Sequence, residues 1–221
     1  MKRMVFLTVL SLLLAGCSKQ QPTQLSGIEA GLLKAGVFTT DNGTTMHIDG
    51  NEGGYDLLTA RRVLVSYQTH PIADPSDVTI DLLGLWDAVM PEPVPEEGVE
   101  QEPDAPVHIT EAWFNAGYLN ILATHAGDPG FTASYFVNGG GITLRLRRDG
   151  MPGEDSVSTF LSIPMTDAVA AYDRFRTSMG REDLEGEIPV TLVWSWYRQT
   201  TDGPSQEVIL YEKKGSFIRF H

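Results

Sequence analysis

The chain of 221 residues contains a single cysteine, Cys17, and only 16 lysines and arginines against 29 acidic residues. One cysteine cannot form a disulfide within the chain, so the fold must depend on apolar burial and hydrogen bonds. So few basic residues give a phosphate backbone little to bind, which argues against nucleic acid as a partner. A hydrophobic content of 42% excludes a disordered acidic tail, and the length fits one large or two small domains. We predict two.

The chain also lacks the run of about 20 apolar residues that a membrane-spanning helix needs. Instead, Lys2 and Arg3 precede a shorter apolar run over residues 4–15, which is the layout of a secretory signal peptide. The run ends in Leu-Ala-Gly-Cys at residues 14–17, which resembles the bacterial lipobox, where the cysteine is lipidated. We therefore predict a signal peptide over residues 1–16 and a membrane anchor at Cys17.

The residues that follow Cys17 bear on location. Ser18 is not the aspartate that resembles an inner-membrane retention signal, so we predict the outer membrane. Residues 18–22 lack the acidic cluster found after the cysteine of many surface-displayed lipoproteins, which favours the periplasmic face over the cell surface. Residues 17–30 are predicted to be a short tether that holds the first domain away from the lipid head groups.

Residues 31–90 contain short strand-like runs separated by turn residues, which is typical of β structure. Residues 41–43, with the sequence Asp-Asn-Gly, indicate a tight turn between two strands. About five short strands are expected of a small closed barrel such as an OB-fold, although an SH3-like barrel has the same periodicity. In an OB-fold, Tyr67 and Arg61 or Arg62 would be places to look for a binding groove. Strands are predicted over residues 33–40, 44–48, 63–68 and 78–89.

Residues 91–106 contain five prolines and six acidic residues but no basic residue. Proline removes backbone donors and the carboxylates repel one another, which favours an extended spacer over a packed element. We predict a solvated linker here, with an acidic docking segment as the alternative. At about 3.1 Å per residue, the linker would span up to roughly 50 Å.

Residues 107–221 are again mostly β by pattern, and about seven strands at short spacing predict a β-sandwich. Apolar and polar residues alternate strictly over residues 142–147, which predicts one buried and one wet face. One helix interrupts the strands, with Thr166 as its predicted cap and Gly180 as its end. Its apolar stripe is expected to pack on the sandwich. The fold class is therefore all-β, an OB-like barrel followed by a β-sandwich with one short helix.

Motifs for catalysis, cofactors and metals are absent. The five histidines have no metal-ligand spacing, and no nucleophile elbow, P-loop or dinucleotide fingerprint occurs. Residues 49–54 begin like a calcium loop, but Ala60 stands where the bidentate carboxylate would be needed, so a plain turn is expected. We predict no catalytic residue, no metal and no cofactor. A pair of carboxylates among the 29 acidic residues would still suffice for a hydrolase, although no spacing indicates one.

The second half is rich in aromatic residues, which either form the core or provide an exposed platform for sugars or peptides. We expect most of them in the core. A position of Trp113 or Tyr197 in an open cleft would favour binding. The residues concerned are Trp113, Phe114, Tyr118, Tyr135, Phe136, Trp194, Trp196 and Tyr197.

Three segments carry a family resemblance beyond the lipobox. Residues 41–46 (DNGTTM), 62–67 (RVLVSY) and 111–121 (EAWFNAGYLNI) together resemble the NigD-like lipoproteins. That family is described as an N-terminal OB domain followed by a C-terminal β-sandwich, and its name comes from a bacteriocin locus. The chain departs from the family pattern in its Pro/Glu segment and in the missing acidic residues after Cys17.

The resemblance implies a fold and no catalytic residues. We therefore expect a non-enzymatic, membrane-tethered binding or accessory protein of the cell envelope, with an envelope protein or a glycan as its partner. The ligand-binding residues are left unassigned. Two alternatives stay open: a bacteriocin immunity or accessory protein, and a carbohydrate- or peptide-active hydrolase.

Overall fold

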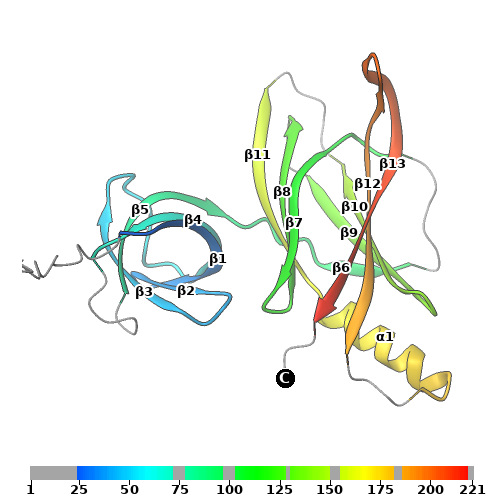
Figure 1. Cartoon of the computed structure of the whole chain (residues 1–221), viewed down its shortest axis with the longest axis horizontal. Helices are drawn as coiled ribbons and strands as arrows, with labels where there is room; N and C mark the ends of the chain where they lie inside the picture. Colours follow the sequence, from blue (N-terminus) through cyan, green and yellow to red (C-terminus); the bar gives the residue numbers. More distant parts are fainter. Residues whose placement is uncertain are drawn as a thin grey trace, which may run out of the picture.

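A computed structural model describes residues 24–71, 78–96, 103–127, 130–149, 155–181 and 186–218. The signal peptide, Cys17 and the first part of the predicted tether lie outside these ranges. Figure 1 shows a closed barrel beside a β-sandwich that carries one helix at its lower end. The predicted all-β class, with a barrel, a sandwich and one short helix, is confirmed.

The barrel closes in the strand order β1-β2-β3-β5-β4. Its interior is filled by side chains that alternate with outward-facing ones, as the period of a strand requires. Leu33, Phe38, Val63, Val65 and Ile80 are fully buried there. The strands are β1 (Ser26–Lys34), β2 (Val37–Thr40), β3 (Thr45–Asn51), β4 (Arg61–Thr69) and β5 (Val78–Asp87).

The start of the barrel corrects two predictions. β1 begins at Ser26 and pairs with β4, so residues 26–30 belong to the barrel and not to a tether. The single strand predicted over residues 33–40 is two strands, because Ala35 and Gly36 turn the chain with φ of 51° and 79°. The turn over residues 41–43 is confirmed, since the amide of Gly43 donates to Thr40.

The prediction of an unpacked spacer over residues 91–106 is wrong for its described parts. β6 (Pro93–Pro95) pairs in parallel with β9 (Phe131–Asn138) and adds an edge strand to the sandwich. Proline is tolerated at such an edge because the outer side of the strand needs no backbone donor. Pro93 is buried against the sheet.

The described parts of residues 91–106 also cover the face of β10 (Gly141–Arg148) that was predicted to be exposed to solvent. Arg145 is 1% exposed and donates to the carboxylate of Asp104 at 2.8 Å. Arg147 lies 2.7 Å from a carboxylate oxygen of Glu96. Asp104 and Glu96 are thus paired with the arginines of β10, and each pair offsets a negative charge that favoured a solvated linker.

The sandwich consists of a five-stranded sheet in the order β13-β12-β10-β9-β6 and a three-stranded sheet in the order β11-β8-β7. Between them lies one apolar core that includes Ile121, Leu144 and Leu161. β10 and β12 pair in parallel, and the helix lies on the chain between β11 and β12. The remaining strands are β7 (His108–Asn115), β8 (Tyr118–Ala126), β11 (Ser156–Pro164), β12 (Glu187–Thr200) and β13 (Gly203–Ile218).

Helix α1 (Thr166–Ser178) packs on β9 and β10 through Ala168 and Tyr172, as its apolar stripe predicts. Thr166 is not its cap. Met165 occupies the N-cap position without a side-chain hydrogen bond, and Thr166 is the first helical residue. The helical pattern ends at Gly180, which has a φ of 72°.

Candidate functional site

A cleft of about 650 Å³ opens between the two sheets at the end of the sandwich opposite α1. It lies where β8 ends and β11 begins, whereas α1 follows the far end of β11 (Figure 1). We call it the end cleft. Its volume is within the range of small-molecule sites. Side chains from both sheets line it, so the distance between the sheets sets its width.

One wall of the end cleft is aromatic. Trp196 and Tyr197 of β12 are half-buried, and their rings meet edge to face at 5.0 Å between centroids. The exposed ring of His108, at the start of β7, lies 5.1 Å from Trp196. Rings held by their neighbours offer a flat surface at little cost in side-chain entropy.

Two buried polar residues, His125 and Arg148, also line the end cleft. Ring nitrogen Nε2 of His125 lies 2.8 Å from the hydroxyl of Thr159, and its ring meets Phe131 edge to face. Burial lowers the pKa of His125, and the positive charge of Arg148 lowers it further. The imidazole is therefore neutral at neutral pH. The guanidinium of Arg148 donates to the carbonyl of Ala126.

Hydroxyl and amide groups complete the lining, from Thr124, Ser156 and Gln199. Among the described residues that line the end cleft, none is an aspartate or glutamate. Within the described ranges there is also no group of three or more His, Cys, Asp or Glu side chains that could hold a metal ion. The end cleft can therefore stack a flat group and donate hydrogen bonds, but its described lining offers no carboxylate pair for acid-base chemistry.

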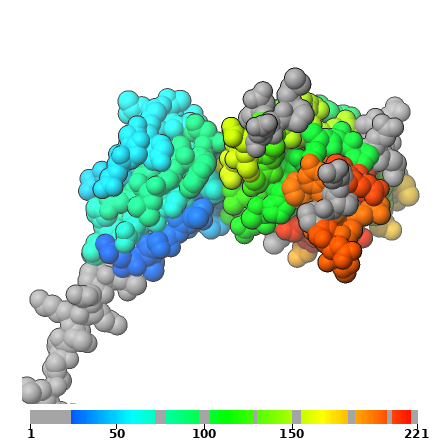
Figure 2. All heavy atoms as spheres, turned by 90° about the horizontal axis from the view of Figure 1, so that it is seen from above, coloured from blue at the N-terminus to red at the C-terminus, as the bar shows by residue number. Residues whose placement is uncertain are grey.

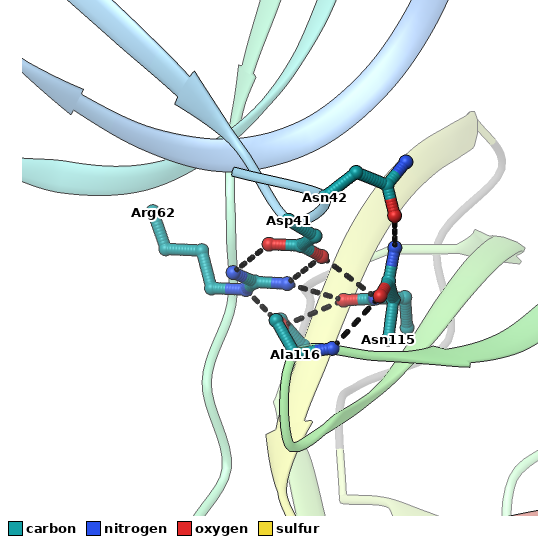
Figure 3. A network of polar contacts seen from close by, with 7 residues as sticks. Asp41, Asn42, Arg62, Asn115 and Ala116 are labelled. Carbon is teal, nitrogen blue, oxygen red and sulfur yellow. Dashed lines mark hydrogen bonds and ion pairs between the residues drawn. The ribbon is translucent and has the colours of Figure 1, made fainter. Parts of the chain in front are cut away.

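A second cluster of polar side chains lies at the junction of barrel and sandwich (Figure 3). Arg62 of β4 donates two parallel hydrogen bonds to Asp41, at 2.8 and 2.7 Å. The same guanidinium bonds Asn120 of β8 at 3.0 Å and Ser162 of β11, and it stacks on the ring of Tyr118 at 3.9 Å. Asn120 and Ser162 are fully buried. We call these residues the junction network.

Apolar contacts surround the junction network. Phe160 of β11 packs against Leu64 and Ala30 of the barrel, and Trp113 stacks on Phe160 with 6.3 Å between ring centroids. Figure 2 shows the barrel in contact with the yellow-green part of the sandwich, where β11 lies. At the rim, Asn115 donates to Asn42 at 3.1 Å.

The chain that connects the two domains is hydrogen-bonded to both. The amide of Ala88 donates to Arg62 in the barrel, and the amide of Val89 donates to Phe160 in the sandwich. The amide of Ser162 returns a hydrogen bond to Val89. Barrel and sandwich are therefore joined by backbone, polar and apolar contacts at once, and they form one body.

The residues suggested for an OB groove have other roles. Tyr67 is buried in the barrel and donates to Glu29 at 2.9 Å, and burial raises its pKa to about 12. Arg61 pairs with Asp56 and Asp87 at the surface, whereas Arg62 belongs to the junction network. A binding groove at these residues stays a prediction.

The aromatic residues of the second half occupy both kinds of position considered from the sequence, the core and a cleft. Tyr135 is buried in the sandwich core, and Trp194 stacks on Tyr211. Trp113 lines a smaller cleft of about 320 Å³ at the junction, and Tyr197 lies in the end cleft, so both occupy a position that was said to favour binding. Sequence patterns missed His125 and Arg148. No residue spacing marks them as a pair, because they lie near the ends of β8 and β10, which belong to different sheets.

The calcium-like stretch over residues 49–54 is the end of β3 followed by the predicted plain turn, in which the amide of Gly54 donates to Asn51. Among the described residues, none of the helices is long and apolar enough to cross a membrane. The lipidation site predicted at Cys17 lies outside the described residues.

No family model and no curated protein sequence matches the chain. Solved structures do. A NigD-like immunity protein from Bacteroides caccae superposes with a TM-score of 0.55 at 20% identity, covering 84% of this chain and 91% of that one. A protein of unknown function from Bacteroides vulgatus matches with a TM-score of 0.55 at 16% identity over 90% and 92% of the two chains.

A third similar structure is a predicted lipoprotein from Bacteroides fragilis, with a TM-score of 0.53 and 14% identity over 89% of this chain and 98% of that one. All three similarities span both domains of the present chain. At these identities they describe the fold. The chain thus has the two-domain fold of the NigD-like proteins, as the resemblance in its sequence predicts.

Proposed function

We propose that the protein is a non-enzymatic accessory lipoprotein of the cell envelope that binds a glycan in the end cleft. The observation that carries the proposal is the aromatic wall of Trp196, Tyr197 and His108 in a cleft with hydroxyl, amide and guanidinium groups. Sugar rings have apolar faces that stack on aromatic rings and hydroxyls that need hydrogen-bond partners. The end cleft provides both.

The binding test uses the full chain, purified from membranes in a mild detergent and titrated with a panel of envelope glycans. Tryptophan fluorescence reports binding because Trp196 lies in the wall. Replacement of this residue, Trp196→Ala, removes most of the flat surface and should weaken binding at least tenfold, which corresponds to about 1.4 kcal/mol. The control is Trp86→Ala, because Trp86 is a partly exposed tryptophan of the barrel. Equal binding by the two variants would refute the site.

A hydrolase is the less favoured alternative. Glycoside hydrolysis in its common form requires two carboxyl groups about 5 to 9.5 Å apart across the scissile bond. The described lining of the end cleft contributes no carboxyl group, and none of the three similar structures bears an enzyme name. Release of shorter fragments from the bound glycan, abolished by Trp196→Ala, would overturn the non-enzymatic assignment.

We also propose that acyl chains on Cys17 anchor the protein in the outer membrane, facing the periplasm. The lipobox-like sequence supports this proposal, and the fold is shared with the predicted lipoprotein of Bacteroides fragilis. Labelling of cells with a palmitate analogue should mark the wild-type protein and not Cys17→Ser. Protease treatment of intact cells should leave the protein whole. Its digestion would place it on the cell surface.

An immunity function is the second candidate, supported by the name of the Bacteroides caccae protein. In that case the partner would be a toxin made by sibling cells, and deletion of the gene would sensitise cells to that toxin. Restoration of resistance by the Trp196→Ala variant would separate this function from glycan binding.

A further inference from the structure

Among the described strands, the sandwich has four sheet edges, and three of them carry features that hinder the addition of another strand. β6 begins and ends with proline. β7 has a bulge between Ile109 and Glu111, and β13 exposes the charged residues 212–214. Prolines, bulges and charged side chains are the usual protections of a sheet edge. β11 is the fourth edge strand, and its residues 156–163 include no proline and no charged residue.

The first part of the β11 edge is unpaired. The chain between the two domains pairs with this edge through Val89, whose amide donates to the carbonyl of Phe160. Every second residue of an antiparallel strand points its N–H and C=O away from the partner strand. Ser156 and Ser158 therefore point theirs to the same side as Phe160, where the described residues provide no backbone partner for them. We call residues 156–160 the free edge, and its start stands clear of the barrel in Figure 1.

An apolar cleft of about 270 Å³ lies beside the free edge, between the sandwich and the barrel. Ser158 and Phe160 line it from β11, and Ile28 and Trp86 line it from the barrel, where they are 62% and 42% exposed. The ring of Trp86 packs over Gly84, where an added Cβ would come within 2.7 Å of it. The described lining contains no charged residue. The apolar cleft can therefore take an apolar side chain.

We propose that the free edge and the apolar cleft bind an extended segment of a partner protein, which adds a strand beside β11. Backbone hydrogen bonds to Ser156, Ser158 and Phe160 hold the segment, and a large apolar side chain on it fills the apolar cleft. The proposal does not depend on glycan binding in the end cleft, whose Trp196 and Tyr197 belong to the other sheet.

The occupant is a segment of a partner and not a second copy of the chain. The free edge covers residues 156–160, whereas a stable interface uses roughly 20–30 residues on each side. Two copies, each with a net charge of -13, would also repel one another. An extended segment needs only the edge and the cleft, and the same charge favours one that is flanked by basic residues.

The test uses a synthetic peptide with blocked ends and the sequence KTVTLTVK, titrated into the ¹⁵N-labelled full chain in detergent. We expect a Kd below about 1 mM, which is still a weak complex. At saturation the amides of Ser158 and Phe160 should exchange with solvent at least tenfold more slowly, because the added strand accepts from them. The indole signal of Trp86 should shift. No change in these signals at that concentration would overturn the proposal.

Two methylated peptides test whether the segment binds as a strand. One carries N-methyl groups on its three threonines, and the other carries them on its two valines and its leucine. Successive amides of a strand point to opposite sides, so only one of the two sets faces β11. One methylated peptide should therefore bind like the parent, and the other at least tenfold more weakly. Equal binding by the two would contradict strand addition.

A protein variant tests the apolar cleft. Trp86→Ala removes one wall and should weaken binding of the parent peptide at least fivefold. The matched control is Leu83→Ala, because Leu83 is 59% exposed on the same strand and lies outside the described lining of the apolar cleft. Equal loss in the two variants would contradict the role of the cleft. The methylated pair decides on strand addition without any change to the protein.

Light scattering of the full chain in detergent tests the choice of occupant. We expect one copy of the chain per detergent particle, with or without the peptide. A dimer that the peptide dissociates would identify a second copy as the occupant of the free edge and would overturn the proposal.

Discussion

The junction and the end cleft use the same kinds of side chain in opposite ways. At the junction, the Arg62 guanidinium contacts Asp41, Asn120, Ser162 and the ring of Tyr118. In the end cleft, the half-buried rings of Trp196 and Tyr197 line an open space. A side chain whose contacts are made inside the protein fixes geometry, whereas a ring beside an open cleft can stack on a ligand.

The two regions should therefore respond differently to mutation. Changes at the junction should affect stability, because they leave buried polar groups without partners. Changes in the end cleft should affect binding with little loss of stability.

The largest effect is expected for Arg62→Ala. Both side chains of the Arg62–Asp41 pair are at least nine-tenths buried, so removal of the arginine leaves a buried carboxylate. We expect a loss of about 3–5 kcal/mol in the free energy of unfolding, measured with urea. The control is the neighbouring Arg61→Ala, whose partner Asp87 is mostly exposed and whose loss should cost no more than about 1 kcal/mol. Similar losses for the two variants would contradict the structural role of the junction.

Two of the half-buried tryptophans, Trp113 and Trp196, sharpen the contrast. Trp113→Ala removes the ring that stacks on Phe160 at the junction and should cost about 2 kcal/mol in urea unfolding. Trp196→Ala opens the wall of the end cleft and should cost about 1 kcal/mol or less. For glycan affinity the order should reverse, with the larger loss in Trp196→Ala. If Trp113→Ala weakened binding more than Trp196→Ala, the ligand site would lie at the junction.

The lowered pKa of His125 predicts that the stability of the protein depends on pH. Its pKa in the folded protein is held below the ordinary 6.5, so the unfolded chain binds the proton first as the pH falls. Stability should therefore decline as the pH falls from about 6.5 toward the folded pKa. Urea unfolding at a series of pH values measures this slope. His125→Gln should reduce it, and an unchanged slope would contradict the assigned direction.

His70 on the barrel should make stability depend on pH in the opposite direction. The change in stability should be the smallest of those predicted. Its hydrogen bond to Asp81, at 2.8 Å, raises the pKa of the exposed ring. The stabilising contribution is thus present below the ordinary pKa of 6.5 and is lost as the pH rises through the folded value. NMR titration of the imidazole signals should show His70 above and His125 below that value. Asp81→Asn should return His70 toward it.

Local features could be predicted from the sequence because they depend on neighbouring residues. The turn over residues 41–43 and the helix end at Gly180 follow from backbone preferences of single residues. The two-domain all-β fold follows from strand patterning and from the family resemblance. Alternation also placed most strands of the sandwich, since a strand with one buried side has a period of two.

Features that depend on distant pairing could not be predicted in this way. The acidic segment was expected to be solvated because the partners of Asp104 and Glu96, Arg145 and Arg147, are on a strand about 40 to 50 residues further along the chain. Arg62 and Ser162 are 100 positions apart. The end cleft takes residues from β7, β8, β10, β11 and β12, so its members share no spacing. Alternating arginines in one strand and a nearby acidic run were the signal for the covered face of β10.

The most direct measurement observes the indole N–H signals of the four tryptophans during titration of the ¹⁵N-labelled full chain with the panel of envelope glycans. Trp86 reports on the barrel, Trp113 on the junction, Trp194 on its stack with Tyr211, and Trp196 on the end cleft. We predict that the Trp196 signal shifts most and that the Trp86 and Trp113 signals stay in place. A shift confined to Trp113 or Trp86, with Trp196 unmoved, would contradict the assignment of the end cleft as the binding site.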